Sequence, residues 1–407
     1  MNDTAAKRVS DALDAFKIEL PSWGFADTGT RFGKFRQDAA AFTTEHKFAD
    51  AGLVNKLTGC CPTVAVHVLW DFEQGADPKK TKQIAEKNGV AVGSINPNVF
   101  QDQAYKLGSF CSPFKESRDA AVKHTLDCVK IGQAVGSTLM SMWLADGTNY
   151  PGQDNLRARK KRLEDGFKQV LDVMRKEWPT GTMLIEYKPF EPAFYHTDIA
   201  DWGMSAAFCN AIGGVKDGKA KVLVDTGHHL PGQNIEHIVA FLLDENLLGG
   251  FHFNDRKYAD DDLTMSSIDP YAVFRIFDQI AQYQHDTGKT PDIAYMVDQS
   301  HNLKPKLEAM VQTVCEAQKF FAKAFLVDRA KLADYQAKGD IVGAETTLRE
   351  AYEADVTPIL SQWRKSKGLP ENPLKALREG GYIAKIGAER KAQRESLGMS
   401  TGDSAYA

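Results

Sequence analysis

Short apolar runs alternate with amphipathic segments along most of the chain. The runs are rich in Val, Ile, Leu and aromatic residues, and turn-forming residues follow most of them. Such runs predict strands that are buried on both faces, as in a parallel sheet. We place eight strands at residues 20–25, 63–68, 89–98, 137–144, 182–188, 221–225, 249–254 and 292–298.

The segments between these runs carry apolar residues at helical spacing, separated by charged residues. They predict helices at 4–18, within 36–58, and at 78–88, 116–135, 156–177, 197–212, 235–245 and 270–283. Regular alternation of strands and helices indicates a parallel sheet, and eight such units fit a (β/α)8 TIM barrel better than an open doubly wound sheet. No GxGxxG or P-loop motif follows any of these strands. This argues against a dinucleotide-binding protein and against a P-loop nucleotide-binding protein.

The chain continues well beyond the eighth strand. Residues 303–355 are mostly helical in pattern, and only part of their large apolar face is needed to close a barrel. We therefore predict a barrel domain with an N-terminal helical extension over residues 1–315, and a helical C-terminal extension over 316–407 that contacts other subunits. The alternative is that this extension packs on its own barrel. The tail from residue 391 is polar and rich in small residues, and we expect it to be loose and disordered.

Composition narrows the class of protein. The 407 residues are 43% hydrophobic and 26% charged, with a net charge of −4. This allows a large core and argues against nonspecific nucleic-acid binding, which needs a basic surface. The six cysteines include no CxxC pair, which favours reduced thiols over disulfides or a zinc-thiolate site. No signal-type or membrane-spanning run is found, so we expect a cytoplasmic protein without membrane contacts.

Polar and aromatic side chains gather where the predicted strands end. In a TIM barrel these carboxyl ends form one mouth, which holds the active site. Most strands start with a glycine or a small hydroxyl residue. The side chains at the strand ends are instead polar, charged or aromatic: Trp70, Asp71, Asn96, Asn98, Trp143, Asp146, Glu186, Lys188, Asp225, His228, His252, Asn254, Asp298, Gln299 and His301. We therefore expect these side chains to converge.

Carboxylates and imidazoles are concentrated in residues 221–262. Asp225 and His228 follow one strand, His252 lies in the next, and the acidic run 260–262 follows it. These are ligand types for divalent metals, and clustered carboxylates need a counter-charge because their repulsion raises their pKa values. The alternative is a solvated acidic loop. Lys188 shares a strand face with Glu186, where the two could instead form a structural ion pair.

Several motifs resemble those of one enzyme family. They are ELPSWGF followed by TGTRF, VAVHVLWD, WLADGTNYPGQ, EPAFYHT, VDTGHH, GGFHFNDRKYADDD and MVDQSHN, and they extend over most of the chain. Together they resemble the metal-dependent sugar isomerases of the L-rhamnose isomerase family, within the wider group of xylose-isomerase-like barrels.

The resemblance implies two divalent ions per subunit, most often Mn²⁺, with Co²⁺ or Mg²⁺ as alternatives. It assigns the first ion to Glu186, Asp225, His252 and Asp298. It assigns the second to His228, Asp260 and Asp262, with Asp225 bridging the two ions.

The resemblance also implies a reaction. The family interconverts aldoses and ketoses, here L-rhamnose and L-rhamnulose and related pairs such as D-allose and D-psicose. Hydrogen moves between C1 and C2, by a metal-promoted hydride shift or through an enediol. The catalytic residues implied are Lys188 as the oxyanion stabiliser, His67 with Asp71 at the ring-opening position, and Asp298.

The same resemblance implies a substrate pocket and an oligomer. Trp70 and Trp143, with His67 and Lys188, would shape the sugar pocket. Phe35 would add to a hydrophobic wall, in its own or a neighbouring subunit. Tetramers are usual in this family, so we expect a homotetramer whose partner molecule is a small sugar.

Other functions compete with this prediction. A sugar epimerase on the same barrel is the nearest, but such enzymes usually hold one metal and use a pair of glutamates as bases. A metal-dependent phosphodiesterase or endonuclease would need more histidine ligands and a basic face. A noncatalytic sugar-binding protein would not need the full ligand set.

Overall fold

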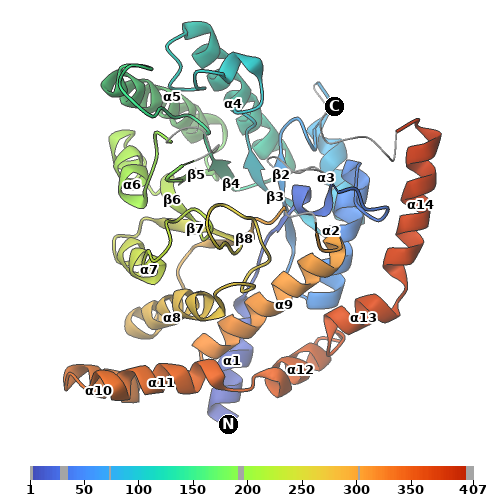
Figure 1. Cartoon of the computed structure of the whole chain (residues 1–407), viewed down its shortest axis with the longest axis vertical. Helices are drawn as coiled ribbons and strands as arrows, with labels where there is room; N and C mark the ends of the chain where they lie inside the picture. Colours follow the sequence, from blue (N-terminus) through green and yellow to red (C-terminus); the bar gives the residue numbers. More distant parts are fainter. Residues whose placement is uncertain (1–2, 28–34, 73–74, 191–196, 301–302, 400–407) are drawn as a thin grey trace.

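The barrel predicted from the alternation of strands and helices is present. The computed structural model describes residues 3–27, 35–72, 75–190, 197–300 and 303–399. Eight parallel strands lie side by side in chain order, and a bridge between Glu19 and Met296 brings the first and last together (Figure 1). The strands are β1 (Leu20–Pro21), β2 (Thr63–His67), β3 (Ala91–Asn96), β4 (Leu139–Met142), β5 (Thr182–Glu186), β6 (Ala220–Asp225), β7 (Leu248–Phe253) and β8 (Ala294–Val297).

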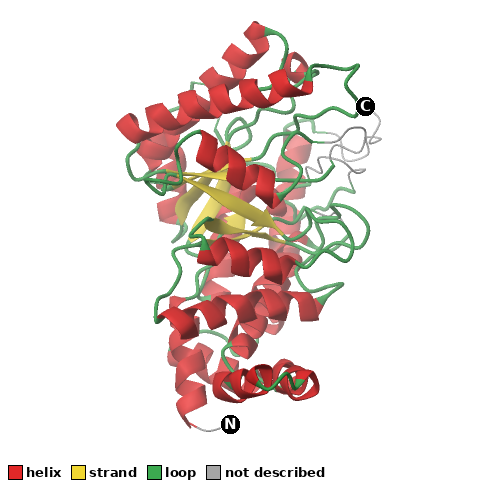
Figure 2. Cartoon of the chain, turned by 90° about the vertical axis from the view of Figure 1, so that its left-hand side faces the viewer, coloured by secondary structure: helices red, strands yellow, loops and turns green. Residues whose placement is uncertain are grey.

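Helices surround this sheet on the outside (Figure 2). They are α1 (Asp3–Ala15), α2 (Thr44–Thr58), α3 (Pro78–Lys87), α4 (Lys115–Val135), α5 (Leu156–Glu177), α6 (Trp202–Ala211), α7 (Ile235–Asp244), α8 (Pro270–Thr287) and α9 (Lys306–Ala324). Side-chain caps begin many of them, as where Asp269 accepts from the backbone N–H of Ala272 before α8. Among the described helices, none has an apolar stretch long enough to cross a bilayer.

The strands are buried because both of their faces are covered. Alternate side chains point inward, where Leu184, Leu223 and Met296 form a small cluster, or outward into the layer against the helices. Near the start of β3, the buried Glu19 carboxylate accepts hydrogen bonds from the backbone N–H and the hydroxyl of Ser94. Gly93 permits this approach, since a Cβ there would lie 1.6 Å from a Glu19 oxygen.

The first predicted strand is much shorter than expected. Only Leu20–Pro21 pairs with β2, and Ser22–Phe25 forms a short 3-10 helix, η1. All four residues of η1 are buried, which explains the apolar pattern that we interpreted as strand. Buried side chains hold this turn, because the Ser22 hydroxyl donates to Asp71 and the Trp23 indole N–H donates to Asp298.

The chain after α9 forms a series of helices along the outer edge of the barrel (Figure 1). These are α10 (Arg329–Ala337), α11 (Ile341–Glu353), α12 (Thr357–Ser366), α13 (Pro373–Glu379) and α14 (Tyr382–Ser396). The predicted domain boundary after residue 315 falls inside α9, and the division into two domains stays a prediction.

The expectation of a loose tail from residue 391 is wrong as far as residue 396. Helix α14 continues to Ser396 because two of its arginines are buried against the N-terminal part of the chain. Arg390 binds both carboxylate oxygens of Asp50 at 2.8 Å, and Arg394 donates to the backbone carbonyls of Asp38 and Ala40. Residues 400–407 of the predicted tail lie outside the described residues.

Candidate metal centre

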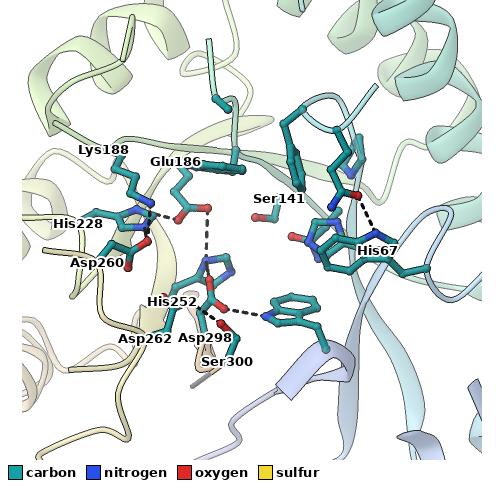
Figure 3. Close-up of a pocket in the computed structure, with 18 residues that line it drawn as sticks. His67, Ser141, Glu186, Lys188, His228, His252, Asp260, Asp262, Asp298 and Ser300 are labelled. Atoms are coloured by element: carbon teal, nitrogen blue, oxygen red, sulfur yellow. Dashed lines mark hydrogen bonds and ion pairs between the residues drawn. The ribbon is translucent and has the colours of Figure 1, made fainter. Parts of the chain in front are cut away.

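A pocket of about 250 Å³ lies at the carboxyl end of the barrel, where the strand ends were expected to converge. Its size suits a small polar molecule. Carboxylates, imidazoles and one lysine gather on one side of it, and His67 lies on the other (Figure 3). The lining residues are Trp23, His67, Trp70, Asn96, Pro97, Phe100, Gln101, Ser141, Trp143, Ala145, Glu186, Lys188, His228, His252, Asp260, Asp262, Asp298 and Ser300.

Four residues from neighbouring strands form a first group of metal-type ligands. Glu186, Asp225, His252 and Asp298 each offer one atom, and these atoms lie within 4.8 Å of one another. His252 Nδ1 is 3.3 Å from Glu186 Oε2 and 3.7 Å from Asp298 Oδ2. The His252 ring is buried, yet neither nitrogen has a hydrogen-bond partner among the described residues. A divalent cation would satisfy this donor set, which combines three carboxylates with one imidazole.

A second group shares one residue with the first. Asp225, His228 and Asp260 offer atoms within 4.8 Å of one another. His228 Nε2 lies 3.3 Å from Asp260 Oδ2 and 3.8 Å from Asp225 Oδ2. The predicted ligand Asp262 lines the same pocket but lies outside this group, and its carboxylate accepts from the Ser300 hydroxyl at 2.6 Å. Asp261, between Asp260 and Asp262, accepts from the backbone N–H of Lys257.

Asp225 is held so that one oxygen faces both groups. Its Oδ1 accepts from the Gly227 backbone N–H at 2.7 Å and from Asn254 Nδ2 at 3.0 Å. Its Oδ2 faces His228 and His252. Gly227 is needed for this turn, because a Cβ there would lie 2.6 Å from the Asn254 side-chain oxygen. Asp225 is therefore the residue that the two ligand groups share, with Oδ2 turned toward both.

The electrostatics of the cluster call for added positive charge. Burial, together with repulsion from Glu186, Asp260 and Asp298, raises the pKa of Asp225 to about 7. Burial alone would lower the pKa of His252, but the Glu186 and Asp298 carboxylates raise it to about 9. Without an ion, a protonated imidazole thus supplies the counter-charge, and a divalent cation would replace that proton.

Lys188 reaches into the pocket beside the second group. It is buried, its ammonium donates to Asp260 Oδ2, and Nζ lies 5.2 Å from the centre of the Trp143 ring. The strand ends at Glu186, yet Lys188 still lines the pocket together with it, as the period of two predicts.

His67 lies in an aromatic wall opposite the carboxylates. Its ring centre is 4.1 Å from that of Trp70, 4.8 Å from that of Trp23 and 5.9 Å from that of Phe100. Burial and the nearby Lys47 ammonium lower the pKa of His67 to about 3, so the ring is neutral near pH 7. The predicted residues Trp70 and Trp143 both belong to this pocket.

Asp71, which the resemblance implies together with His67 at the ring-opening position, directs its carboxylate to the backbone of His67. The Asp71 carboxylate accepts from the backbone N–H of His67 at 3.0 Å, from Ser22 Oγ at 2.6 Å and from Lys47 Nζ at 2.7 Å. A tight turn causes this, because the backbone N–H groups of Trp70 and Asp71 both donate to the His67 carbonyl. Asp71 therefore fastens the turn and does not line the pocket.

Phe35 does not line the pocket of its own subunit. Its side chain is 64% exposed and borders a separate hollow with Leu303 and Ile383. Of its two predicted placements, only a role toward a neighbouring subunit remains as a prediction. Residues 28–34 and 191–196, which hold parts of two motifs, and the candidate His301 lie outside the described residues.

Sequence reasoning missed several lining residues. Trp23 was assigned to a strand, yet its indole N–H donates to Asp298 Oδ1 at 2.8 Å. Phe100 packs on Trp143 at 4.9 Å between ring centres, and Ser300 binds Asp262. Position directly after a strand could have pointed to Ser300, whereas nothing in the local pattern marks Phe100.

Known proteins resemble this chain in sequence and in fold. The family model described as "Xylose isomerase-like TIM barrel" matches residues 64–284. A "Probable sugar isomerase" of Mesorhizobium japonicum is 38% identical over 385 residues, which cover 93% of this chain and 87% of the relative. Another from Rhizobium meliloti is 38% identical over 389 residues, covering 94% and 88%. The solved structure of an L-ribulose 3-epimerase shares the fold, with a TM-score of 0.53, 13% identity and coverage of 83% of this chain and 97% of that one.

Proposed function

This chain belongs to the xylose isomerase-like TIM barrel family, and it is similar over most of its length to two probable sugar isomerases. We therefore propose that it is a metal-dependent aldose–ketose isomerase. Its proposed substrates are L-rhamnose and L-rhamnulose, with related pairs such as D-allose and D-psicose. The observation that carries the proposal is the pair of ligand groups that share Asp225 at the mouth of the barrel.

The first ion would be held by Glu186, Asp225, His252 and Asp298, and the second by His228, Asp260 and Asp262 together with Asp225. Mn²⁺ is the proposed metal, with Co²⁺ or Mg²⁺ as substitutes. When bound, such ions polarise the sugar oxygens O1 and O2 and orient the open chain. Asp298 is the most exposed ligand of its group, with 22% of its side chain accessible, and it is the carboxylate best placed to meet the substrate as well.

The remaining residues bind the sugar and stabilise charge. The Lys188 ammonium would donate to the oxygen that becomes negative at C1 or C2 during hydrogen transfer. His67, neutral near pH 7, carries one N–H that can donate to the ring oxygen as the sugar ring opens. The indole faces of Trp70 and Trp143 would cover the apolar face of the sugar and exclude water. Transfer by hydride shift and transfer through an enediol both fit these roles.

An epimerase is the second candidate, since several solved structures that share the fold are epimerases, among them an L-ribulose 3-epimerase and a 3-keto-D-glucoside 4-epimerase. Among the described residues that line the pocket, Glu186 is the only glutamate. A pair of glutamates acting as bases is therefore not found there, which favours the isomerase.

A panel assay tests the proposal. Metal-stripped protein is reloaded with Mn²⁺, Co²⁺ or Mg²⁺ and given L-rhamnose, L-lyxose, L-mannose and D-allose, while ¹³C NMR follows the products. We expect a ketose from L-rhamnose and from at least one other aldose, and none without metal. A product inverted at one carbon without ketose formation would identify an epimerase, and no product from any sugar would refute the proposal. Glu186→Gln should lose metal and activity together.

We also propose that the protein assembles as a homotetramer. The exposed side chains of Phe35 and Leu303, which border one hollow, support a contact between subunits. Light scattering after size-exclusion chromatography should give four times the subunit mass. A monomeric mass at working concentrations would contradict this.

A further inference from the structure

A buried polar pair lies behind the second ligand group. Tyr187 Oη and His229 Nε2 share a hydrogen bond of 2.7 Å, and the two rings meet edge to face at 5.4 Å. Both side chains are buried, and neither lines the pocket. A tyrosine–histidine pair is costly to bury unless it is satisfied, so simple packing would be served better by apolar side chains. We therefore expect this hydrogen bond to have a role other than packing in the core.

The pair joins the two segments that carry the ligands. Tyr187 stands between Glu186 and Lys188 after β5, and its side chain points away from theirs because side chains alternate along an extended segment. His229 directly follows His228 in the loop after β6. The Tyr187–His229 hydrogen bond thus fastens the end of β5 to the β6 loop from the side opposite the pocket.

The main chain of Tyr187 then reaches a metal-type ligand. Its carbonyl oxygen lies 3.2 Å from His228 Nδ1, and Glu186 Oε1 lies 3.1 Å from the same nitrogen, so the ring N–H has two acceptors beside it. These two acceptors hold the ring so that Nε2 faces Asp260 and Asp225, at 3.3 and 3.8 Å. Histidines that bind metal commonly donate their other N–H to such an acceptor, and loss of the acceptor typically weakens the metal about 10- to 100-fold.

We infer that Tyr187 and His229 are positioning residues for the second metal ion, which they serve by holding the carbonyl oxygen that orients His228. The inference rests on the proposed function for its second ion. The proposed function concerns the reaction, whereas this inference concerns only how tightly the second ion binds. Among the described residues, the Tyr187 hydroxyl bonds to His229 and to no ligand of the first group, so the first ion should be affected less than the second.

The test compares Tyr187→Phe with a matched control, Tyr295→Phe. Tyr295 lies in β8 among aromatic rings, and within the described part of the chain its hydroxyl makes no hydrogen bond to a ligand residue. Mn²⁺ binding to metal-free protein is measured by isothermal titration calorimetry, and the coupling of two nearby Mn²⁺ ions is followed by electron paramagnetic resonance. Tyr187→Phe keeps the carbonyl and removes only the hydrogen bond that holds it, so we expect one of two binding steps to weaken by about 10-fold, the lower end of the effect of losing such an acceptor. The coupled signal should then appear only at higher Mn²⁺, and kcat should recover at saturating metal. Tyr295→Phe should match the wild type.

A second variant separates positioning from folding. His229→Gln keeps a polar group near the tyrosine hydroxyl and should bind the second ion more tightly than His229→Leu. Two unchanged binding steps in Tyr187→Phe would overturn the inference, as would equal weakening of both steps with a lower melting temperature of the metal-free protein. If the wild type binds two coupled ions but converts no aldose, the proposed function fails while this inference can still be tested and upheld.

Discussion

Replacing Trp23 by phenylalanine should weaken metal binding without disturbing the barrel. The indole N–H of Trp23 donates to Asp298 Oδ1 at 2.8 Å and holds that carboxylate in the first ligand group. Phenylalanine keeps an aromatic ring beside His67 but removes the donor. A hydrogen bond to a charged group contributes about 1.5–3 kcal/mol. Because the Asp298 side chain is 22% exposed, we take the lower end, which corresponds to a loss of metal affinity of roughly 10-fold.

The loss of metal affinity in Trp23→Phe should become larger as the pH falls. Burial raises the pKa of Asp298 above its ordinary value, and the Trp23 hydrogen bond acts in the opposite direction. Removing the indole therefore raises that pKa further, so that protons compete better with the metal at acidic pH. The difference between variant and wild type should be larger at pH 5.5 than at pH 8.

Calorimetric titration of metal-free protein with Mn²⁺ at several pH values measures both effects. Trp178→Phe is the matched control, since the buried Trp178 indole N–H donates to the Ser137 carbonyl at 2.8 Å, before the start of β4. That variant should lose stability but keep the metal affinity of the wild type. Equal affinity of Trp23→Phe and wild type across the pH range would refute the reasoning.

Three further predictions follow from the described contacts. Lys188→Met should lower kcat about 10²- to 10³-fold in steady-state assays while two ions still bind, because a donor to the developing oxyanion is lost; unchanged kcat would contradict its role. In metal-free protein the pKa of His252 is raised from 6.5 to about 9. The protonated His252 ring therefore stabilises the folded state fully below pH 6.5, and this contribution to the free energy of unfolding is lost as the pH rises toward 9. The melting temperature should therefore fall over that window and stay nearly level with saturating Mn²⁺, and a level metal-free profile would speak against a protonated counter-charge. Arg390→Met should cost about 3–5 kcal/mol of unfolding free energy in urea, because it leaves Asp50 buried and unpaired, with Mn²⁺ affinity as the unaffected control.

The fold was predictable because each strand is a buried apolar run whose neighbours along the chain are also its neighbours in space. In a parallel barrel the order of strands follows the order of the sequence, so local patterns suffice. The exception is Ser22–Phe25, which is as buried as a strand but curls into a turn. Burial pattern alone does not separate these two cases, because the difference lies in contacts to Asp71 and Asp298, far along the chain.

The ligand groups were predictable for the same reason, since strand ends in a barrel meet at one mouth. What could not be predicted is where a side chain turns after its strand ends. The resemblance implied that Asp71 acts together with His67, and the tight turn directs the Asp71 carboxylate to the backbone N–H of His67. Asn254 was noted only as a strand-end residue, although it holds one oxygen of Asp225. Such contacts depend on loop geometry, which residue type and spacing do not specify.

The attachment of α14 has a consequence for the order in which the molecule is completed. Arg390 reaches Asp50 across 340 residues of chain, and Arg394 reaches the carbonyls of residues 38 and 40 across more than 350. During synthesis residues 38–50 emerge early and must wait for these partners until residue 394 has been made. We expect residues 38–50 to be among the last of the described residues to become ordered on the ribosome, so that a chain ending before α14 would form most of the barrel and leave this segment unattached.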